Sequence, residues 1–244
     1  MTVPVVVVDQ IFSCIEGADA QPRLQDFVLS MVFANAAARA QSKQGDGFAP
    51  DAFRGAWSSA LGNLGWVITG AGTSTIHTQS RGATTTLADR IIASAPSAGV
   101  EKALGALNAL CGVGSDKGDD AGLAKLWWQS GSDFAPFYAS AGSVDLTGAS
   151  VVAELAQFSV KLDDLEVKER GFLHPKSKPL DPNSAAAIFD DVLESSIELS
   201  AFHIQLELHP EKFAASKQDL IAKLGDKVFD HFITSPAGLY GEKS

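Results

Sequence analysis

Residues 50–69 read PDAFRGAWSSALGNLGWVIT and join two segments of different hydrophobic period. In the first segment, apolar side chains recur at the three- and four-residue spacing of one helix face. They are Ala52, Phe53, Ala56, Trp57, Ala60, Leu61 and Leu64. Asn63 and Gly65 tolerate the left-handed conformation that ends a helix, and residues 66–68 then favour a strand. The stretch predicts a helix that passes directly into a strand.

The same junction predicts the centre of the hydrophobic core. Phe53, Trp57 and Trp66 each bury about 150–250 Å² when they lie inside a protein. Aromatic residues at helical spacing usually face a core. The alternative is an aromatic shelf that binds a ligand.

The composition is that of an ordinary globular protein. The chain has 244 residues, of which 45% are hydrophobic and 20% charged, close to the averages for soluble domains. This length suits one large domain or two small ones. Because no repeat and no clear linker divides the chain, we predict a single domain over residues 1–244.

The formal net charge of −10 bears on partners. Nucleic acids and anionic lipid surfaces favour Lys/Arg patches, so neither is expected to bind; neutral lipid stays open. No apolar run approaches the roughly 20 residues of a membrane-spanning helix. The start, MTVPVVVVDQ, lacks the basic region of a signal peptide. We expect a cytoplasmic protein, or one exported without a classical signal peptide.

Two elements are predicted before the junction. Residues 3–8 form an apolar run in which Pro4 favours an edge strand or the start of a strand. Such a strand promotes aggregation unless it is paired or covered. The apolar residues within 11–15 suggest a short helix, and the stripe within 22–42 predicts a long one.

Beyond the junction the pattern predicts helices first and strands later. The expected elements are a polar strand or hairpin over 70–80, helices over 85–95, 99–113 and 123–128, strands over 134–143, 149–162 and 197–209, and a last helix from Pro210 to Phe232. Within 156–163, apolar and polar residues alternate, which indicates a half-buried strand. The order predicts an α+β fold with N-terminal helices on a mainly antiparallel sheet and a closing C-terminal helix.

This layout contains a distinctive W-x-x-x-L-G-N-L-G-W-V-I junction from Trp57 to Ile68, preceded by an alanine-rich helix. An A-L-x-x-L helix at 103–110 and a K-L-G-D-K segment at 223–227 follow it. In these segments the chain resembles a family of small uncharacterised fungal and bacterial proteins. The resemblance implies one domain and brings no activity or site residue with it.

The most concentrated polar pattern is His203-x-Gln205-x-Glu207-x-His209, on one face of a predicted strand. His203 and His209 would lie about 20 Å apart and cannot share a metal ion. Glu207 and His209, about 7 Å apart, would need ligands from another element. We therefore predict no metal site and place these side chains on the solvent face of a sheet.

Other familiar motifs are incomplete. The segment GAGTST at 70–75 lacks the third glycine and the helix of a dinucleotide fingerprint, and GVGSDKGDD at 112–120 lacks the ending of a phosphate-binding loop. Its aspartates lack calcium-loop spacing. The acidic pairs at 163–164 and 190–191 diverge in an extended chain. The sequence predicts no cofactor and no catalytic set.

The two cysteines, Cys14 and Cys111, are too few for a disulfide framework or a thiolate metal site. Cys111 lies near a helix end, where the dipole raises the thiol pKa, and on an apolar stripe. Cys14 has no basic neighbour in the sequence. Reaction or acylation of either thiol is left open.

Trp127 and Trp128 are adjacent in a short predicted helix. Their side chains project about 100° apart, so one neighbour cannot bury both. We predict that one of them contacts a partner.

These observations favour a non-enzymatic binding or self-assembling protein with apolar contact surfaces. Its partner would be a protein, another copy, a hydrophobic ligand or neutral lipid. One alternative is a membrane-active toxin or virulence-type factor, suggested by the long amphipathic and small-residue helices. The other is a thiol-dependent acyl-transfer enzyme that uses Cys14 or Cys111.

Overall fold

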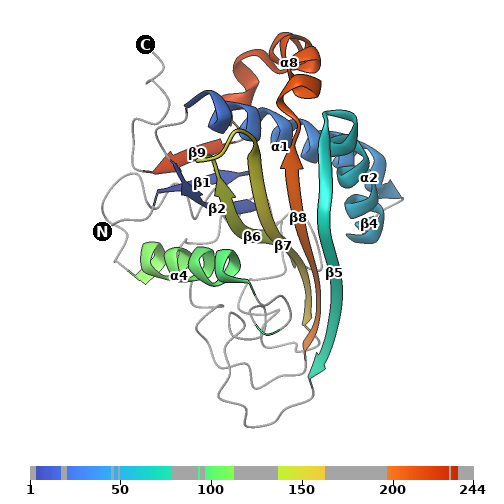
Figure 1. Ribbon diagram of the computed structural model, residues 1–244. Coiled ribbons are helices and arrows are strands. Elements are labelled where there is room, and N and C mark those ends of the chain that lie inside the picture. The colour runs from blue at the N-terminus through green and yellow to red at the C-terminus, as the bar shows by residue number, and fades with distance from the viewer. Residues whose placement is uncertain are drawn as a thin grey trace.

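The computed structural model describes residues 4–17, 21–44, 47–48, 50–78, 93, 97–112, 137–162, 197–230 and 232–235. Seven strands form one sheet in the order β5-β8-β7-β6-β2-β1-β9 (Figure 1). They are β1 (Val5–Val8), β2 (Ile11–Glu16), β5 (Trp66–Thr78), β6 (Phe137–Asp145), β7 (Val151–Leu162), β8 (Ile197–Leu208) and β9 (Phe232–Ser235). Of the described strand pairs in this sheet, only β2–β6 is parallel. A separate two-stranded ribbon joins β3 (Lys43–Gln44) to β4 (Gly47–Phe48).

Helices cover both faces of the sheet. They are α1 (Gln21–Ser42), α2 (Pro50–Asn63), α4 (Ala98–Gly112) and α8 (Pro210–Leu224), and the 3-10 helix η2 (Gly225–Asp230) follows α8. The sheet side chains that join α1, α2 and α8 in the buried core include Val144, Ala153 and Leu155. Helix α4 instead meets side chains of the opposite face, Ser143 and Glu154, and Figure 1 shows it apart from α1, α2 and α8. The predicted α+β class is confirmed.

The predicted junction is confirmed at residue resolution. Helix α2 ends at Asn63 and β5 begins at Trp66. Gly65 between them has φ +93°, a conformation that side-chain-bearing residues rarely adopt. A Cβ at Gly65 would also lie 2.7 Å from the Cβ of Lys212 in α8. Glycine is therefore required both for the turn and for the close approach of α8.

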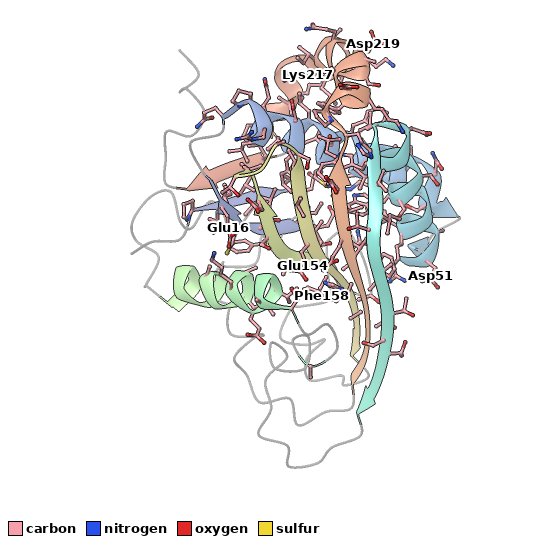
Figure 2. The ribbon with its side chains drawn as sticks, viewed as in Figure 1. Glu16, Asp51, Glu154, Phe158, Lys217 and Asp219 are labelled. Atoms are coloured by element: carbon pink, nitrogen blue, oxygen red, sulfur yellow. The ribbon has the colours of Figure 1, made fainter. Side chains whose placement is uncertain are left out.

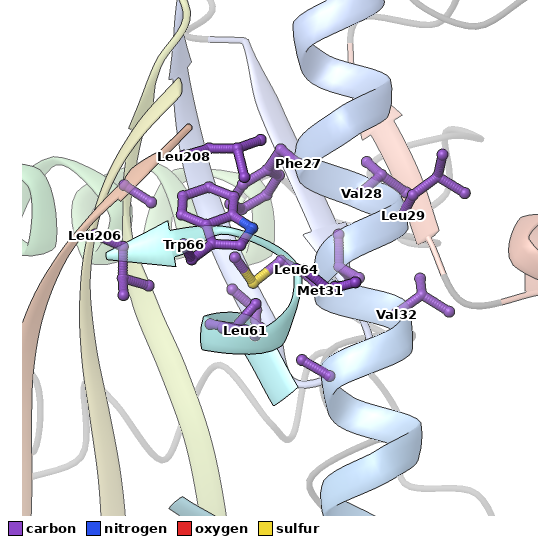
Figure 3. Packing of buried hydrophobic residues seen from close by; sticks show 14 of the residues in the cluster. Phe27, Val28, Leu29, Met31, Val32, Leu61, Leu64, Trp66, Leu206 and Leu208 are labelled. Atoms are coloured by element: carbon purple, nitrogen blue, oxygen red, sulfur yellow. The ribbon is translucent and has the colours of Figure 1, made fainter. Parts of the chain in front are cut away.

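The junction lies inside the core, as predicted. Trp57 and Trp66 are both buried. The Trp66 ring meets Phe27 of α1 edge-to-face, with 6.4 Å between the ring centroids and 71° between the ring planes. Figure 3 shows Trp66 among Phe27, Leu206 and Leu208. One side chain thus joins α1 to the strands β5 and β8.

The N-terminal strand is an interior strand rather than an exposed edge. β1 lies between β2 and β9, and all four of its valines are buried. Pro4 precedes the strand, which agrees with the predicted strand start. The apolar edge that we expected near residues 5–8 is therefore paired on both sides and cannot serve as a contact surface.

The prediction of a short helix within 11–15 is wrong, because these residues lie in the strand β2. Asp9 and Gln10 connect β1 to β2, and Asp9 has φ +48°. Three hydrogen bonds hold this turn against α1. Asn35 Nδ2 donates to Asp9 Oδ2 at 3.2 Å, Gln10 Nε2 to Asn35 Oδ1 at 3.3 Å and Arg39 to Gln10 Oε1 at 3.1 Å. The hairpin allows both faces of the apolar run to be buried.

Two further expectations are corrected. The alternation in β7 predicted that Gln157 and Ser159 face solvent, but both are buried with the neighbouring apolar residues. The closing helix is present as α8 but ends at Leu224, and Phe232, predicted on its stripe, begins β9. Pairing with β1 places Phe232 opposite Val8, and this tertiary contact outweighs the helical spacing.

The other predicted elements divide between two groups. The long helix α1, the helix α4 and the strands β5, β6, β7 and β8 lie where the patterns placed them. The helix predicted over 123–128 lies outside the described residues, as does all of 85–95 except residue 93. That the whole chain is a single domain stays a prediction.

Removing either core tryptophan should destabilise the protein strongly. We expect Trp57→Ala and Trp66→Ala each to lower the free energy of unfolding by about 3–5 kcal/mol, the range for large aromatic side chains in cores. Ile221→Ala in α8 is the control, because Ile221 is 38% exposed and exposed positions change stability by about 0.5 kcal/mol or less. Urea unfolding measures all three. Tryptophan variants that unfold like the control would contradict the assigned core.

Candidate functional site: the β5 edge

The strand β5 forms one edge of the seven-stranded sheet. It is 13 residues long and pairs with β8 on one side, while no described strand pairs with its other side. Figure 1 shows it as the long cyan strand at the right of the sheet. An edge strand carries a row of backbone N–H and C=O groups that can pair with another chain.

The composition of β5 does little to prevent such pairing. Edges are usually protected by charged residues, proline or a bulge. Residues 66–78, WVITGAGTSTIHT, contain no Asp, Glu, Lys, Arg or Pro, and the register shifts only once, between Ile68 and Gly70. Val67 is 39% exposed and Ile68 47%. The edge is long, uncharged and partly apolar.

The register of the sheet places a polar row beside this edge. On the face that α4 partly covers, Gly70 pairs with Gln205, Gln205 with Glu154, and Glu154 with Ser143. Glu154 Oε1 accepts a hydrogen bond from Gln205 Nε2 at 3.4 Å and lies 3.0 Å from His203 Nε2. Figure 2 shows Glu154 on β7, close to α4. One carboxylate therefore orients two side chains of β8.

Two glycines of β5 lie on this same face, and the space beside them differs. Gly70 is opposite Gln205, and Gly72 is opposite His203. A Cβ at Gly70 would lie 2.9 Å from Gln205 Oε1, whereas a Cβ at Gly72 would meet nothing within 4 Å. We call the surface formed by Gly70, Gly72, Glu154, His203 and Gln205 the edge notch. Its floor is backbone, and its inner wall presents the amide oxygen of Gln205.

The next row adds apolar and acidic groups to the notch. Glu207 of β8 lies between Val67 of β5 and Val152 of β7. Val152 is exposed, like Val67, and Glu207 Oε1 accepts a hydrogen bond from Ser150 Oγ at 2.7 Å. The notch and this row contain two carboxylates, Glu154 and Glu207, and neither Lys nor Arg. The surface can bind an extended chain with a cationic or donor side chain.

Helix α4 packs against the end of the polar row that is formed by Ser143 and Glu154. Ser97 Oγ accepts the N–H of Val100 at 3.3 Å and caps the helix. At Gly99 a Cβ would overlap Ser143 Oγ and lie 3.2 Å from Glu154 Oε2. The helix therefore starts in direct contact with the strand face, and its N-terminal end lies near the Glu154 carboxylate.

Cys14 of β2 extends the row of Ser143, Glu154 and Gln205, but its side chain is buried. It pairs with Ser143, is fully buried, and burial raises its pKa to about 11, although the nearby Lys102 ammonium partly opposes this. The Lys102 Nζ group lies 2.8 Å from Glu16 Oε1. The thiol is therefore protonated at neutral pH, which disfavours nucleophilic chemistry.

The remaining candidate residues are only partly described. Cys111 lies in α4, next to its last residue, but its side chain falls outside the described residues. Trp127 and Trp128 lie outside them altogether. The four residues of the His203–His209 pattern separate: the first three lie on β8, and His209 precedes α8. Within the described ranges, no group of three His, Cys, Asp or Glu side chains is placed to hold a metal ion.

None of the helices described is long and apolar enough to cross a membrane. The small-residue half of α1, which suggested a membrane-active protein, has a packing role here. It lies in the helix that packs against α2, with Ala34 and Ala38 buried.

Comparisons of the chain with protein-family models, with curated proteins and with solved structures found no match.

Sequence reasoning identified Gln205 and His203 as exposed polar residues but missed the notch. The sequence places Gly70 and Gly72 in an incomplete dinucleotide motif and in a predicted polar strand or hairpin. Two glycines in an uncharged, threonine-rich extended segment are a usable signal for an open sheet edge. The contribution of Glu154 required the register, because it lies 49 residues from His203 in the chain.

The structure predicts that Cys14 resists thiol reagents. In a Cys111→Ser variant Cys14 is the single cysteine. With a pKa of about 11, the thiolate fraction at pH 7 is about 10⁻⁴, against about 3% for an ordinary cysteine. We expect reaction with Ellman's reagent at pH 7.5 to be at least about 100-fold slower in the folded protein than in urea. Labelling of the folded protein at the unfolded rate would contradict the buried site.

Proposed function

We propose that the chain is a non-enzymatic binding protein whose contact surface is the edge strand β5. An extended segment of a protein partner adds to β5 as a further strand. Main-chain hydrogen bonds supply the affinity, and the side chains on alternate residues supply the specificity.

The observation that carries this proposal is the unprotected character of β5. The strand is 13 residues long, and residues 67–69 and 71–73 are exposed. Val67, Ile68 and the neighbouring Val152 are three of the large hydrophobic residues that are exposed. Long, apolar and uncharged edges are the ones that pair with other chains.

The thiol-dependent alternative gains no support from Cys14, which is sealed and protonated. The residues of the edge notch also include no cysteine. Glu154 holds His203 and Gln205 by hydrogen bonds, which is an arrangement for positioning side chains. Binding explains the exposed edge, whereas the enzymatic alternative does not use it.

The backbone geometry gives a specific way to block the edge. Gly65 accepts the N–H of His209 at 3.0 Å. Because hydrogen-bonded and non-hydrogen-bonded pairs alternate in an antiparallel ladder, Val67 bonds to β8 and Ile68 directs its N–H outward. Ile68→Pro removes this outward donor and leaves the ladder to β8 intact.

The test begins with peptides selected from a displayed library of random dodecamers on the wild-type protein. A selected peptide should slow amide hydrogen exchange at the outward N–H groups of β5 at least about 10-fold. We expect Ile68→Pro to lower its affinity at least about 10-fold and Ile68→Ala, which keeps the N–H, to lower it less. Exchange is measured by mass spectrometry and affinity by fluorescence anisotropy.

Circular dichroism and urea unfolding establish that both variants are folded. Peptides that protect another surface, such as α8, would show that β5 is not the contact strand. Equal affinity for the wild type and Ile68→Pro would do the same.

A further inference from the structure

We infer that the segment that binds β5 belongs to a different protein and carries an arginine or lysine opposite Gly70. This inference rests on the proposed function and identifies the class of partner. It follows from the geometry of the edge notch, from its charge and from the poor fit of a second copy.

The geometry allows a side chain of an added strand to cross β5. Such a strand lies about 4.8 Å outside β5, so its Cα opposite Gly70 lies about 9–10 Å from that of Gln205. An extended arginine reaches about 7 Å from its Cα. A Cβ at Gly72 would meet nothing within 4 Å, so the path over β5 is open there, whereas above Gly70 it meets Gln205 Oε1. A long side chain can lie across the strand and end at β8.

The end of this path presents a hydrogen-bond acceptor. Gln205 Nε2 is engaged by Glu154, which turns Gln205 Oε1 toward Gly70, 2.9 Å from where a Cβ would lie. The crossing side chain must therefore be a donor. A purely apolar side chain would cover the amide oxygen of Gln205 without satisfying it.

The charge of the surroundings selects a cation among the donors. Glu154 lies directly behind Gln205, and Glu207 lies two residues along β8. Arginine and lysine form charge-assisted hydrogen bonds and gain from both carboxylates. The whole chain has a formal net charge of −10, which also attracts a basic segment from solution.

A second copy of this chain does not fit the notch. In a two-fold antiparallel pairing centred on Ala71, Gly70 of one copy faces Gly72 of the other, and the notch stays empty. A shifted register brings Val67 or Ser74 to this position, and both are too short to reach Gln205. Two copies, each with net charge −10, also repel one another. Strand β5 of a second copy therefore does not fill the notch, and the notch suits a segment of different sequence.

The experiment uses three blocked, fluorescein-labelled nonapeptides, TVRVRVRVT, TVQVQVQVT and TVEVEVEVT, whose alternate residues face one side when extended. Anisotropy should show that the arginine peptide binds the wild-type protein at least 10-fold more tightly than the glutamine peptide, with no detectable binding of the glutamate peptide. The affinity of the arginine peptide should fall as salt increases.

Two variants separate the notch from general attraction to an acidic protein. Gly72→Val fills the notch without changing any charge, and the open space around Gly72 lets the variant fold. Gly62→Ala is the control. It adds a side chain at an exposed glycine in α2, outside the notch, where a Cβ also meets nothing within 4 Å. We expect Gly72→Val and the double variant Glu154→Gln/Glu207→Gln each to weaken the arginine peptide at least 10-fold, and Gly62→Ala to leave it unchanged.

The outcomes distinguish this inference from the proposed function. Equal binding of all three peptides, lost in Ile68→Pro, would overturn the cationic partner and leave strand addition at β5 standing. If the arginine peptide bound Gly72→Val as tightly as it binds the wild type, the cationic partner would also be overturned. Binding that is unaffected by Ile68→Pro would overturn both proposals. Failure of all three peptides to bind, with native mass spectrometry showing a dimer and exchange protection in β5, would identify a second copy as the partner.

Discussion

The packing of Trp66 against α1 and β8 is the constraint on which the rest of the structure depends. The ring meets Phe27 edge-to-face and lies beside Leu206 and Leu208 (Figure 3). Gly65 allows α2 to turn directly into β5. The buried Trp66 therefore fixes both the position of the helix α2 and the register of the strand β5. The first residue of β5 is thus anchored in the core, and the residues that follow run along the edge of the sheet, partly exposed. A strong anchor and an open edge are two consequences of the same junction.

The polar row extends this arrangement across the sheet. Ser143, Glu154 and Gln205 come from three strands and lie in one line beside Gly70. Helix α4 contacts one end of the line through Gly99, while the space beside Gly72 of β5 is open at the other end. The buried end contains Cys14, whose thiol is protonated at neutral pH, and the exposed end contains an amide acceptor and two carboxylates. A single row therefore passes from a structural interior to a surface suited to recognition.

Local periodicity predicted the elements in which buried residues recur at a helix or strand spacing. It failed where pairing with a distant strand determines the secondary structure. Helices α2 and α8 and strand β8 could be identified because each has one apolar face. Helix α1 could be identified from its length and strong helix formers, although residues 27–32 are all buried. Residues 11–15 are apolar on both faces, so a short helix and a buried strand were equally compatible with them. Phe232 continues a helical spacing, yet pairing with Val8 makes it a strand residue. The edge notch required the register between β5, β8 and β7, which no local pattern encodes.

The pairing of β1 with β9 has a consequence for synthesis of the chain. Val5–Val8 form hydrogen-bonded partners of residues 232–235, so the two segments that complete this side of the sheet are separated by nearly the whole described chain. On the ribosome, the four valines emerge before β9 and can pair with β2 in a short hairpin, but their other side stays open until β9 has been made. Contacts of such long sequence separation form slowly, and unpaired apolar strands aggregate while they wait. The hairpin of β1 and β2 is therefore exposed to aggregation until β9 has been made.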